Sequence, residues 1–175
     1  MHAQEFQVRP ARPADIASLF RIKRELARVA GAEATLRATE RDWLRDAFGS
    51  APHFQLFVAE SGGDIVGMTA FTRVYMTALG GMVLVIQDLF VAPEYRKRSV
   101  GRALVAEVAA VAIAESIPLI ELNVAADNPA RKFYRRLGFQ HLKECLTYAV
   151  GGSGMLDLAL SAQSAPTSRR SVAAQ

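Results

Sequence analysis

A short basic turn is the part of this sequence where residue types and spacing most directly indicate chemistry. Residues 94–104 read EYRKRSVGRAL, which is three cations in a turn, one glycine and then an apolar run. The turn follows an apolar stretch at 82–91 and precedes a predicted helix at 100–116. The first amides of a helix lack intrahelical partners, and the helix dipole adds roughly +0.5 charge at that end. Exposed amides ahead of such an end form an anion site, to which the cations add charge-assisted hydrogen bonds.

Three interpretations of this turn compete: a solvated surface turn, part of a nucleic-acid surface, or a cradle for a diphosphate. A Walker A loop is excluded because no Gly-Lys-Ser/Thr sequence ends the turn. The G-x-G-x-x-G sequence of a dinucleotide-binding unit is also missing after the first strand. The alanine- and valine-rich helix that follows argues against nucleic acid, because it brings neither interleaved aromatics nor a recognition surface. We therefore favour the cradle and expect no nucleic-acid partner.

The composition is that of a globular protein of one domain. Of the 175 residues, 51% are apolar and 22% are charged, and the net charge of +4 weakly favours anionic partners. Cys145 is the one cysteine, which excludes an intrachain disulfide and a multi-cysteine zinc site and is consistent with a reducing cytoplasm. No stretch approaches ~18 uninterrupted apolar residues, so we expect no membrane span, and no metal site is predicted.

The apolar pattern predicts an α/β domain with a mixed sheet, which we place at residues 1–160, followed by a disordered tail at 161–175. Period-two alternation and helical spacing predict the following order of elements. Strands are expected at 6–10, 54–60, 65–75, 82–91, 119–124, 139–150 and 155–160, and helices at 14–29, from 39 to 48, at 100–116 and at 129–137. In the second helix, Thr39 and Asp42 form a capping pair, and Trp43, Leu44 and Phe48 are the expected buried face.

With these elements in order, the chain resembles the GNAT superfamily of acetyltransferases. The family signature, Gln/Arg-x-x-Gly-x-Gly/Ala between a strand and a helix, is matched by residues 96–101, which read RKRSVG. Ser99 stands where the signature has its first glycine; its amide can still donate, but serine adopts a positive φ at a higher cost than glycine. Residues 127–139, DNPARKFYRRLGF, resemble the late Asn-x-x-Ala-x-x-Phe-Tyr-x-x-x-Gly-Phe block, with Asp127 or Asn128 in the place of the asparagine.

The resemblance extends to the diamine (spermidine/spermine) acetyltransferase type through 22–27, 39–42, 48–49 and 57–60. It implies a GNAT-like single domain, with a mixed, mostly antiparallel sheet that has a central splay and is flanked by helices. It also implies acetyl-CoA as cosubstrate and, through the late strands, a homodimer. The residues implied in cofactor binding are Leu89, Phe90 and Val91 along the strand, Arg96, Lys97, Arg98, Ser99, Val100, Gly101 and Arg102 at the diphosphate, and Asp127, Asn128 and Ala130 in the late block.

The catalytic residues implied by the resemblance are Tyr134, Gln87 and Asp88. Tyr134 matches the tyrosine acid of the family, and a phenol of pKa ~10 suits a departing thiolate of pKa ~8.5. Gln87 occupies the slot in which diamine acetyltransferases carry a glutamate, and an amide can orient an amine or a water but cannot act as a base. Asp88 follows directly, and strand alternation sends its side chain to the opposite face. Other candidates for the base, without a spacing argument, are Glu33, Glu121 and His141.

The acceptor expected from this pattern is the primary amine of a small molecule, namely an amino acid, a small amine or a polyamine. Polyamines need carboxylates to attract them, and the chain has Gln87, Ala30 and an acid-free loop at 77–81 where acidic groups would serve. These features make a polyamine less favoured than the overall resemblance implies, and an amino acid, a small amine or an amino-sugar-like acceptor is equally expected. The alternative function is a non-catalytic acyl-CoA-binding module.

Overall fold

One five-stranded sheet organises the first of two compact units of the chain, residues 1–137 and 138–175. The computed structural model describes residues 6–142 and 149–163, with side chains up to 160. The strands are β1 (Gln7–Pro10), β2 (Gln55–Ser61), β3 (Asp64–Met76), β4 (Gly81–Val91) and β5 (Ile120–Leu122). The helices of the first unit are α1 (Ile16–Val29), α2 (Glu40–Phe48), α3 (Val100–Ala114) and α4 (Arg131–Arg136), with short 3-10 turns at Pro13–Asp15 (η1), Glu33–Thr35 (η2) and Pro93–Tyr95 (η3).

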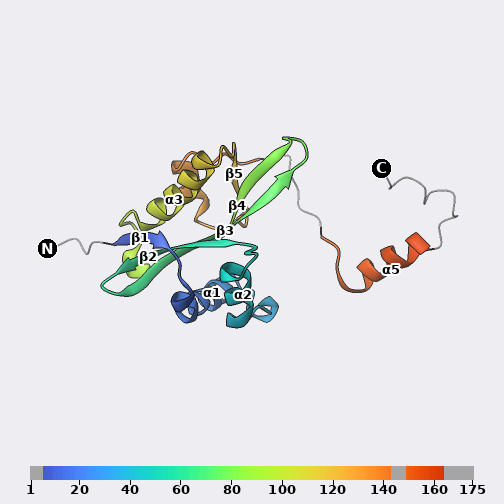
Figure 1. The fold of residues 1–175 in the computed structure, drawn as a ribbon, viewed down its shortest axis with the longest axis horizontal. Helices are drawn as coiled ribbons and strands as arrows, with labels where there is room; N and C mark the ends of the chain where they lie inside the picture. The colour runs from blue at the N-terminus through green and yellow to red at the C-terminus, as the bar shows by residue number, and fades with distance from the viewer. Residues whose placement is uncertain (1–5, 143–148, 164–175) are drawn as a thin grey trace. The chain divides into compact units, whose positions relative to one another are not determined.

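The sheet has the strand order β1-β2-β3-β4-β5, so that neighbours in the chain are neighbours in space (Figure 1). The first four strands pair antiparallel, and β5 pairs parallel to β4. Tight connections suit the antiparallel pairs, such as the turn at Gly62 and Gly63, where both residues have positive φ. A parallel pair needs a longer crossover, and α3 provides it. The mixed, mostly antiparallel sheet is the architecture expected from the sequence.

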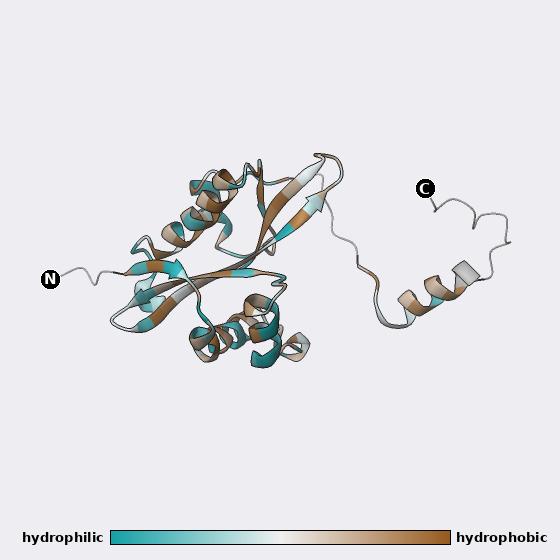
Figure 2. Ribbon diagram, viewed as in Figure 1, coloured by the Kyte–Doolittle hydropathy of each residue, from teal (hydrophilic) through white to brown (hydrophobic). Residues whose placement is uncertain are grey.

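Helices cover both faces of this sheet, α1 and α2 on one face and α3 on the other (Figure 1). Strand alternation divides the core accordingly, because Val58 packs with the α1–α2 cluster and its neighbour Ala59 packs with α3. Figure 2 shows the apolar residues concentrated along the strands and α3, and the polar ones on much of α1 and α2. The apolar run of β4 is buried only in part. Val83 and Leu84 are buried, but Gln87 is exposed and residues 88–91 are half-buried.

The predicted start of α2 is confirmed by its capping geometry. The Thr39 hydroxyl oxygen accepts a hydrogen bond from the Asp42 amide at 3.2 Å, and the Asp42 carboxylate accepts one from the Thr39 amide at 2.9 Å. Trp43 is buried, with its ring edge-on to Phe20 and to Phe54. Leu44, in contrast, is 42% exposed, so its place in the buried face was wrong: it follows Trp43 by one position and lies about 100° further round the helix.

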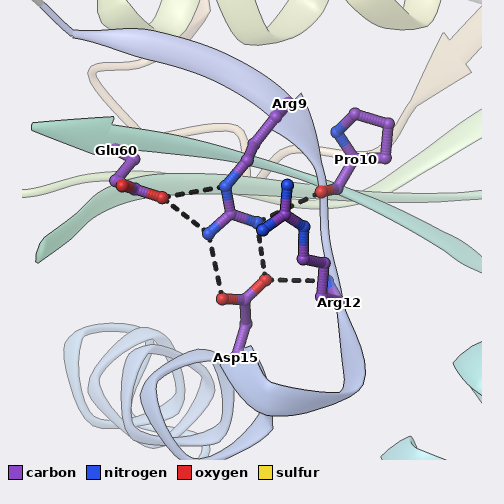
Figure 3. A network of polar contacts seen from close by, with 5 residues as sticks. All are labelled: Arg9, Pro10, Arg12, Asp15 and Glu60. Atoms are coloured by element: carbon purple, nitrogen blue, oxygen red, sulfur yellow. Dashed lines mark hydrogen bonds and ion pairs between the residues drawn. The ribbon is translucent and has the colours of Figure 1, made fainter. Parts of the chain in front are cut away.

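A cluster of charged side chains joins the first strand to its surroundings (Figure 3). The Arg9 guanidinium donates to both oxygens of Asp15, at 2.7 and 3.0 Å, and to Glu60 on β2 at 2.8 Å. The Asp15 carboxylate also accepts from the backbone amide of Arg12, at 2.7 Å. These contacts fix the four-residue β1 at the sheet edge and the chain's entry into α1.

The second unit contains one described element, the helix α5 (Gly152–Gln163). The strand expected at 155–160 was therefore wrong. The strand expected at 139–150 is not formed at residues 139–142 or 149–150, and its centre lies outside the described residues. A helix satisfies its backbone locally, whereas a strand needs a partner, and the described part of this unit holds no strand. Of the expected tail, residues 161–163 lie within α5 and the rest falls outside the described residues. No helix in the described ranges is both long and apolar enough to span a membrane.

Candidate active site

The sheet opens between β4 and β5, and this splay is the central feature of the site. The two strands pair at only three positions, the last of which joins Ile86 to Leu122. Beyond that point β4 continues to Val91 with β3 as its partner. The register with β3 passes from Ile86 directly to Asp88, so Gln87 is the extra residue of a β-bulge. The bulge thus lies at the position where the pairing with β5 ends.

The backbone of β4 beyond the bulge presents an edge that has no strand partner among the described residues. The Asp88 carbonyl accepts from the Thr69 hydroxyl, and the Ala92 amide donates to Val66, so both residues direct their backbone groups toward β3. Successive residues of a strand alternate in this respect, and Leu89 and Val91 therefore direct theirs toward the open edge. The Val91 carbonyl accepts from Arg96 Nε at 3.0 Å, which uses one of its two lone pairs.

The basic turn has the backbone geometry of an anion-binding loop. Lys97 and Ser99 both have positive φ, 63° and 65°, and Ser99 precedes the first residue of α3. The first hydrogen bond into the helix runs from the Ala103 amide to the Ser99 carbonyl. The amides of residues 100–102 therefore point out of the helix end, as is usual for a first turn. Residues 96–99 are exposed, and the Arg98 guanidinium lies 5.4 Å from the centre of the Tyr95 ring.

Two glycines near this turn have packing roles. A Cβ at Gly101 would lie 3.3 Å from the Phe133 ring and 3.5 Å from Val91, so the missing side chain of Gly101 serves the packing of α4 against the start of α3. On β3, a Cβ at Gly67 would lie 3.2 Å from both Val100 and Leu104. Gly67, which the sequence pattern did not single out, lets the helix end approach the sheet.

The late block forms a turn and the short helix α4. The Asn128 side-chain oxygen accepts from the Ala130 amide at 2.9 Å, so Asn128 organises the turn before the helix, while Asp127 is exposed. Tyr134 is half-buried, with its ring 5.3 Å from that of Phe133, the residue that contacts Gly101. Burial raises the pKa of the Tyr134 phenol above its ordinary value of 10.0. The phenol is therefore protonated at neutral pH, which is the state that a proton donor requires.

Gln87 and Asp88 have different surroundings although they are adjacent. Gln87 is exposed. The Asp88 carboxylate receives two hydrogen bonds from Lys23 Nζ of α1, at 2.8 and 2.9 Å. Of the other base candidates, Glu33 is exposed in η2, Glu121 is half-buried in β5 and His141 belongs to the second unit.

Lys23 lies beside the splay but was not among the predicted site residues, although its place in the sequence held a signal. The apolar stripe of α1 runs through Ile16, Leu19, Phe20 and Leu26, and Lys23 stands in that stripe at helical spacing. A lysine on the core side of a helix calls for a charged partner, because an unpaired ammonium is costly to bury. The partner, 65 residues further along the chain, could not be read from the spacing.

The open strand edge and the amide-rich loop fit a nucleotide-linked thioester. An extended chain with amide groups can pair with the edge at Leu89 and Val91, as a strand would. A diphosphate can accept hydrogen bonds from the amides at the start of α3. Within the described residues, no three His, Cys, Asp or Glu side chains come together as metal ligands.

The chain is similar to known acetyltransferases in sequence and in fold. The profile of the acetyltransferase (GNAT) family matches residues 16–139. A mouse thialysine N-epsilon-acetyltransferase is 30% identical over 165 residues, which cover 87% of this chain and 96% of the mouse protein. The bovine thialysine N-epsilon-acetyltransferase is 30% identical over 146 residues, covering 78% and 85%.

Solved structures share the fold at lower identity. An integron cassette protein of V. cholerae superposes with a TM-score of 0.72 at 22% identity, covering 88% of this chain and 97% of the other. An aminoglycoside N-acetyltransferase in complex with CoA superposes with a TM-score of 0.69 at 18% identity, covering 85% and 96%. The profile match spans most of the chain and includes β4, the basic turn and α4. The chain therefore belongs to the acetyltransferase (GNAT) family, whose members are enzymes that use acetyl-CoA as the acetyl donor.

Proposed function

We propose that the protein is an N-acetyltransferase that moves the acetyl group of acetyl-CoA to a primary amine of a small molecule by direct attack. One observation carries the proposal: the edge of β4 that has no strand partner in the described part of the chain leads, through η3, straight into the amide-rich turn before α3. A thioester carrier needs both parts at once, an edge for its amide-containing arm and a cradle for its diphosphate. Here the two parts are separated by fewer than ten residues of one continuous segment.

The cofactor would be held mainly by main-chain groups. Leu89 and Val91 would pair with the amides of its arm through their backbones, and Phe90, between them, supports the strand from the opposite cluster. The diphosphate would be bound by the amides of Lys97 to Arg102 and attracted by the cations of the turn, including Arg96 and Arg98. Asp127, Asn128 and Ala130 would complete the site at the turn before α4.

The chemistry supplied by acetyl-CoA is a thioester open to attack by an amine. The amine nitrogen bonds to the acyl carbon as the bond from that carbon to sulfur breaks; the nitrogen releases a proton and the sulfur takes one up. Tyr134 would donate the proton to the sulfur, since its phenol is protonated at neutral pH. Gln87 would orient the amine or a water that removes its proton, because an amide is not a base. The Asp88 carboxylate, held by Lys23, would position the site rather than abstract the proton.

The acceptor class is inferred from similar proteins and from the charges of the site. The mouse and bovine relatives are named for thialysine, an amino acid with a side-chain amine, and several structures of the same fold are aminoglycoside acetyltransferases. Amino acids, small amines and amino sugars are therefore the first acceptors to test. A polyamine is less favoured because the acid position beside the splay is Gln87.

A homodimer in the cytoplasm is the proposed state of the protein. Four large apolar side chains of α5, Met155, Leu156, Leu158 and Leu160, are each more than half exposed, and a second copy could cover them. In the first unit, the outer edge of β5 has no strand partner among the described residues. The single cysteine is consistent with a reducing compartment.

The proposal is tested by thiol release from acetyl-CoA with a panel of amines. We expect turnover with at least one amino acid or small amine, and a decrease in kcat of about 10²-fold in Tyr134→Phe. Tyr75→Phe is the matched control, because Tyr75 is an exposed tyrosine at the end of β3, and its kcat should equal that of the wild type. Equal loss in both variants, or no loss in either, would contradict the role of Tyr134.

The alternative, a non-catalytic acyl-CoA-binding module, is favoured by one observation: the exposed Gln87 provides no carboxylate at the splay. Calorimetry separates the two functions. Both predict heat when acetyl-CoA is titrated into the protein, but only the enzyme releases thiol when an amine is added. Binding without turnover across the whole panel would favour the module, and a lack of binding would contradict both.

A further inference from the structure

An ion pair links the helix α1 to β4 beside the splay. Lys23 Nζ lies 2.8 and 2.9 Å from the two oxygens of Asp88, so one ammonium neutralises the whole carboxylate. The side chains are 26% and 13% exposed, respectively. They therefore lie at the border of the core and retain access to solvent. The position of Lys23 in the apolar stripe of α1 means that the helix directs this cation toward the sheet.

The pair adjoins the position where an acceptor has to meet the thioester. Asp88 directly follows the bulged Gln87, at which β4 loses its pairing with β5. The residues that follow Asp88 pack on alternate faces of the sheet. Phe90 packs with the α1–α2 cluster, whereas Leu89 and Val91 pack with the α3 cluster. The diphosphate cradle lies at the start of α3, so a carrier bound there approaches the splay from the α3 side. The acceptor is then left with the α1 side, where Lys23 and Asp88 meet.

The charge of the pair decides which acceptors gain from binding near it. A lone carboxylate close to the splay would attract the distant ammonium of a diamine, because a charge pair in a partly desolvated site is screened less than in water. With Lys23 in contact, the pair carries no net charge. A second cation on the acceptor then gains little from Asp88 and meets repulsion from Lys23.

We propose that Lys23 is a specificity-determining residue that neutralises Asp88 and thereby selects amines whose far end is neutral or zwitterionic over diamines and polyamines. This inference rests on the proposed function and narrows its acceptor class. An amino acid with a side-chain amine meets the condition, because its far end carries both charges. Lys23 acts through Asp88, and it needs no contact with the reacting atoms.

The test is a ratio of specificities measured across a set of charge variants. We compare kcat/KM for 1,4-diaminobutane with kcat/KM for propylamine in the wild type, Lys23→Met, Lys23→Arg and Asp88→Asn. Lys23→Met should raise the diamine-to-monoamine ratio about tenfold, which corresponds to about 1.4 kcal/mol. Lys23→Arg should keep the ratio of the wild type, and Asp88→Asn should lower it because Lys23 is left without its counter-charge.

The double variant Lys23→Met/Asp88→Asn makes the test independent of damage to the fold. It has neither charge, so its ratio should return toward that of the wild type even if both singles are less stable. Arg28→Met is the matched control, because Arg28 is an exposed cation of the same helix that pairs with Glu25. Its ratio should not change.

The outcomes separate the inference from the proposed function. A ratio in Lys23→Met within about twofold of the wild type, or an equal rise in Arg28→Met, overturns the inference. The same ratio is also measured as binding, by calorimetry of both amines in the presence of CoA, where no transfer can occur. A wild type that transfers acetyl to no amine therefore refutes the proposed function alone, while the binding ratios still support or overturn the role of Lys23.

Discussion

Ser99 has the left-handed backbone conformation, φ 65° and ψ 3°, at the turn that leads into α3. Residues with a Cβ adopt this conformation at a cost of roughly 1–2 kcal/mol, whereas glycine adopts it freely. The turn therefore keeps the shape of a glycine-containing anion loop although a serine occupies the position. The amide of Ser99 remains available to the loop, so the substitution changes the stability of the loop before it changes its donors.

Replacing Ser99 by glycine should release this strain. We expect Ser99→Gly to raise the free energy of unfolding by up to about 1 kcal/mol, because the relief of roughly 1–2 kcal/mol exceeds the greater freedom that glycine gives the unfolded chain. Urea denaturation measures the change. Ser99→Ala, which keeps the Cβ and loses only the hydroxyl, is the control and should bring no gain. Equal midpoints for the two variants would show that the conformation is not strained.

The protonation of Tyr134 predicts the alkaline side of the pH profile. Burial raises the pKa of the phenol above 10.0, and an acid works only below its pKa. The kcat of the wild type should therefore hold its value through neutral pH and decline only above pH 10, as the phenol ionises. Tyr134→Phe should lack this decline. The profile is measured at saturating amine, and a decline that persists unchanged in Tyr134→Phe would assign it to another group.

At the scale of elements, the short first strand depends on the contacts of Arg9. β1 has four residues, and its edge position provides pairing on one side only. Arg9 adds bonds to Glu60 of the next strand and to Asp15 at the start of α1 (Figure 3). The guanidinium of Arg9 therefore joins β1 both to β2 and to the start of α1.

Asp15 should make the stability of this junction depend on pH. The hydrogen bond from Arg9, followed by that from the Arg12 amide, holds the pKa of Asp15 below its ordinary value of 3.8. A lowered pKa contributes stability that is present above the unfolded value and is lost as the pH falls through the folded value. Asp15→Asn should reduce the free energy of unfolding by about 1–3 kcal/mol at pH 7, and the difference from the wild type should shrink below pH 4.

Urea denaturation at several pH values measures this effect. Asp46→Asn is the control, because Asp46 pairs with the exposed Arg45 at the surface, where ion pairs add little to stability. It should show no comparable loss at pH 7. A difference for Asp15→Asn that remained constant down to pH 2 would contradict the assignment.

At the scale of the whole molecule, the exposed apolar side chains of α5 bear on assembly. If a second copy covers them, sedimentation should give twice the 19.0 kDa mass of the chain. Leu158→Asp should shift the protein toward the monomer, because a carboxylate would be buried without a partner. Leu79→Asp, at a leucine of the β3–β4 hairpin that is also more than half exposed, is the control and should leave the mass unchanged. A monomeric wild type at micromolar concentration would contradict the proposal.

Much of the fold of the first unit could be predicted from local patterns. Period-two alternation located β2 and β3, and the capping pair of Thr39 and Asp42 located the start of α2. These features depend on neighbours in the chain. Leu44 was wrongly predicted to be buried, and the segment that forms α5 was wrongly predicted to contain a strand. The exposure of a leucine and the choice between strand and helix both depend on what packs against them.

The same distinction holds for the candidate site: features set by neighbouring residues could be predicted, and features set by contacts between distant segments could not. The basic turn and the late block around Tyr134 could be located from the spacing of their residues, because each is one short continuous segment of the chain. The bulge at Gln87 could not, since it exists only in the register between two strands. The pairing of Lys23 with Asp88 also escaped prediction, although the unusual place of a lysine in an apolar stripe was visible.

By itself, the sequence determined the class of the fold, the family and the position of the basic turn that we propose binds the diphosphate, because each depends on residues close together in the chain. Only the tertiary structure decided that the edge of β4 opens at the bulge, that Gly101 serves the packing of Phe133, and that Asp88 is neutralised from α1. These properties arise between segments that meet only after folding, when register, close packing and charge pairing are set by contacts across the sheet.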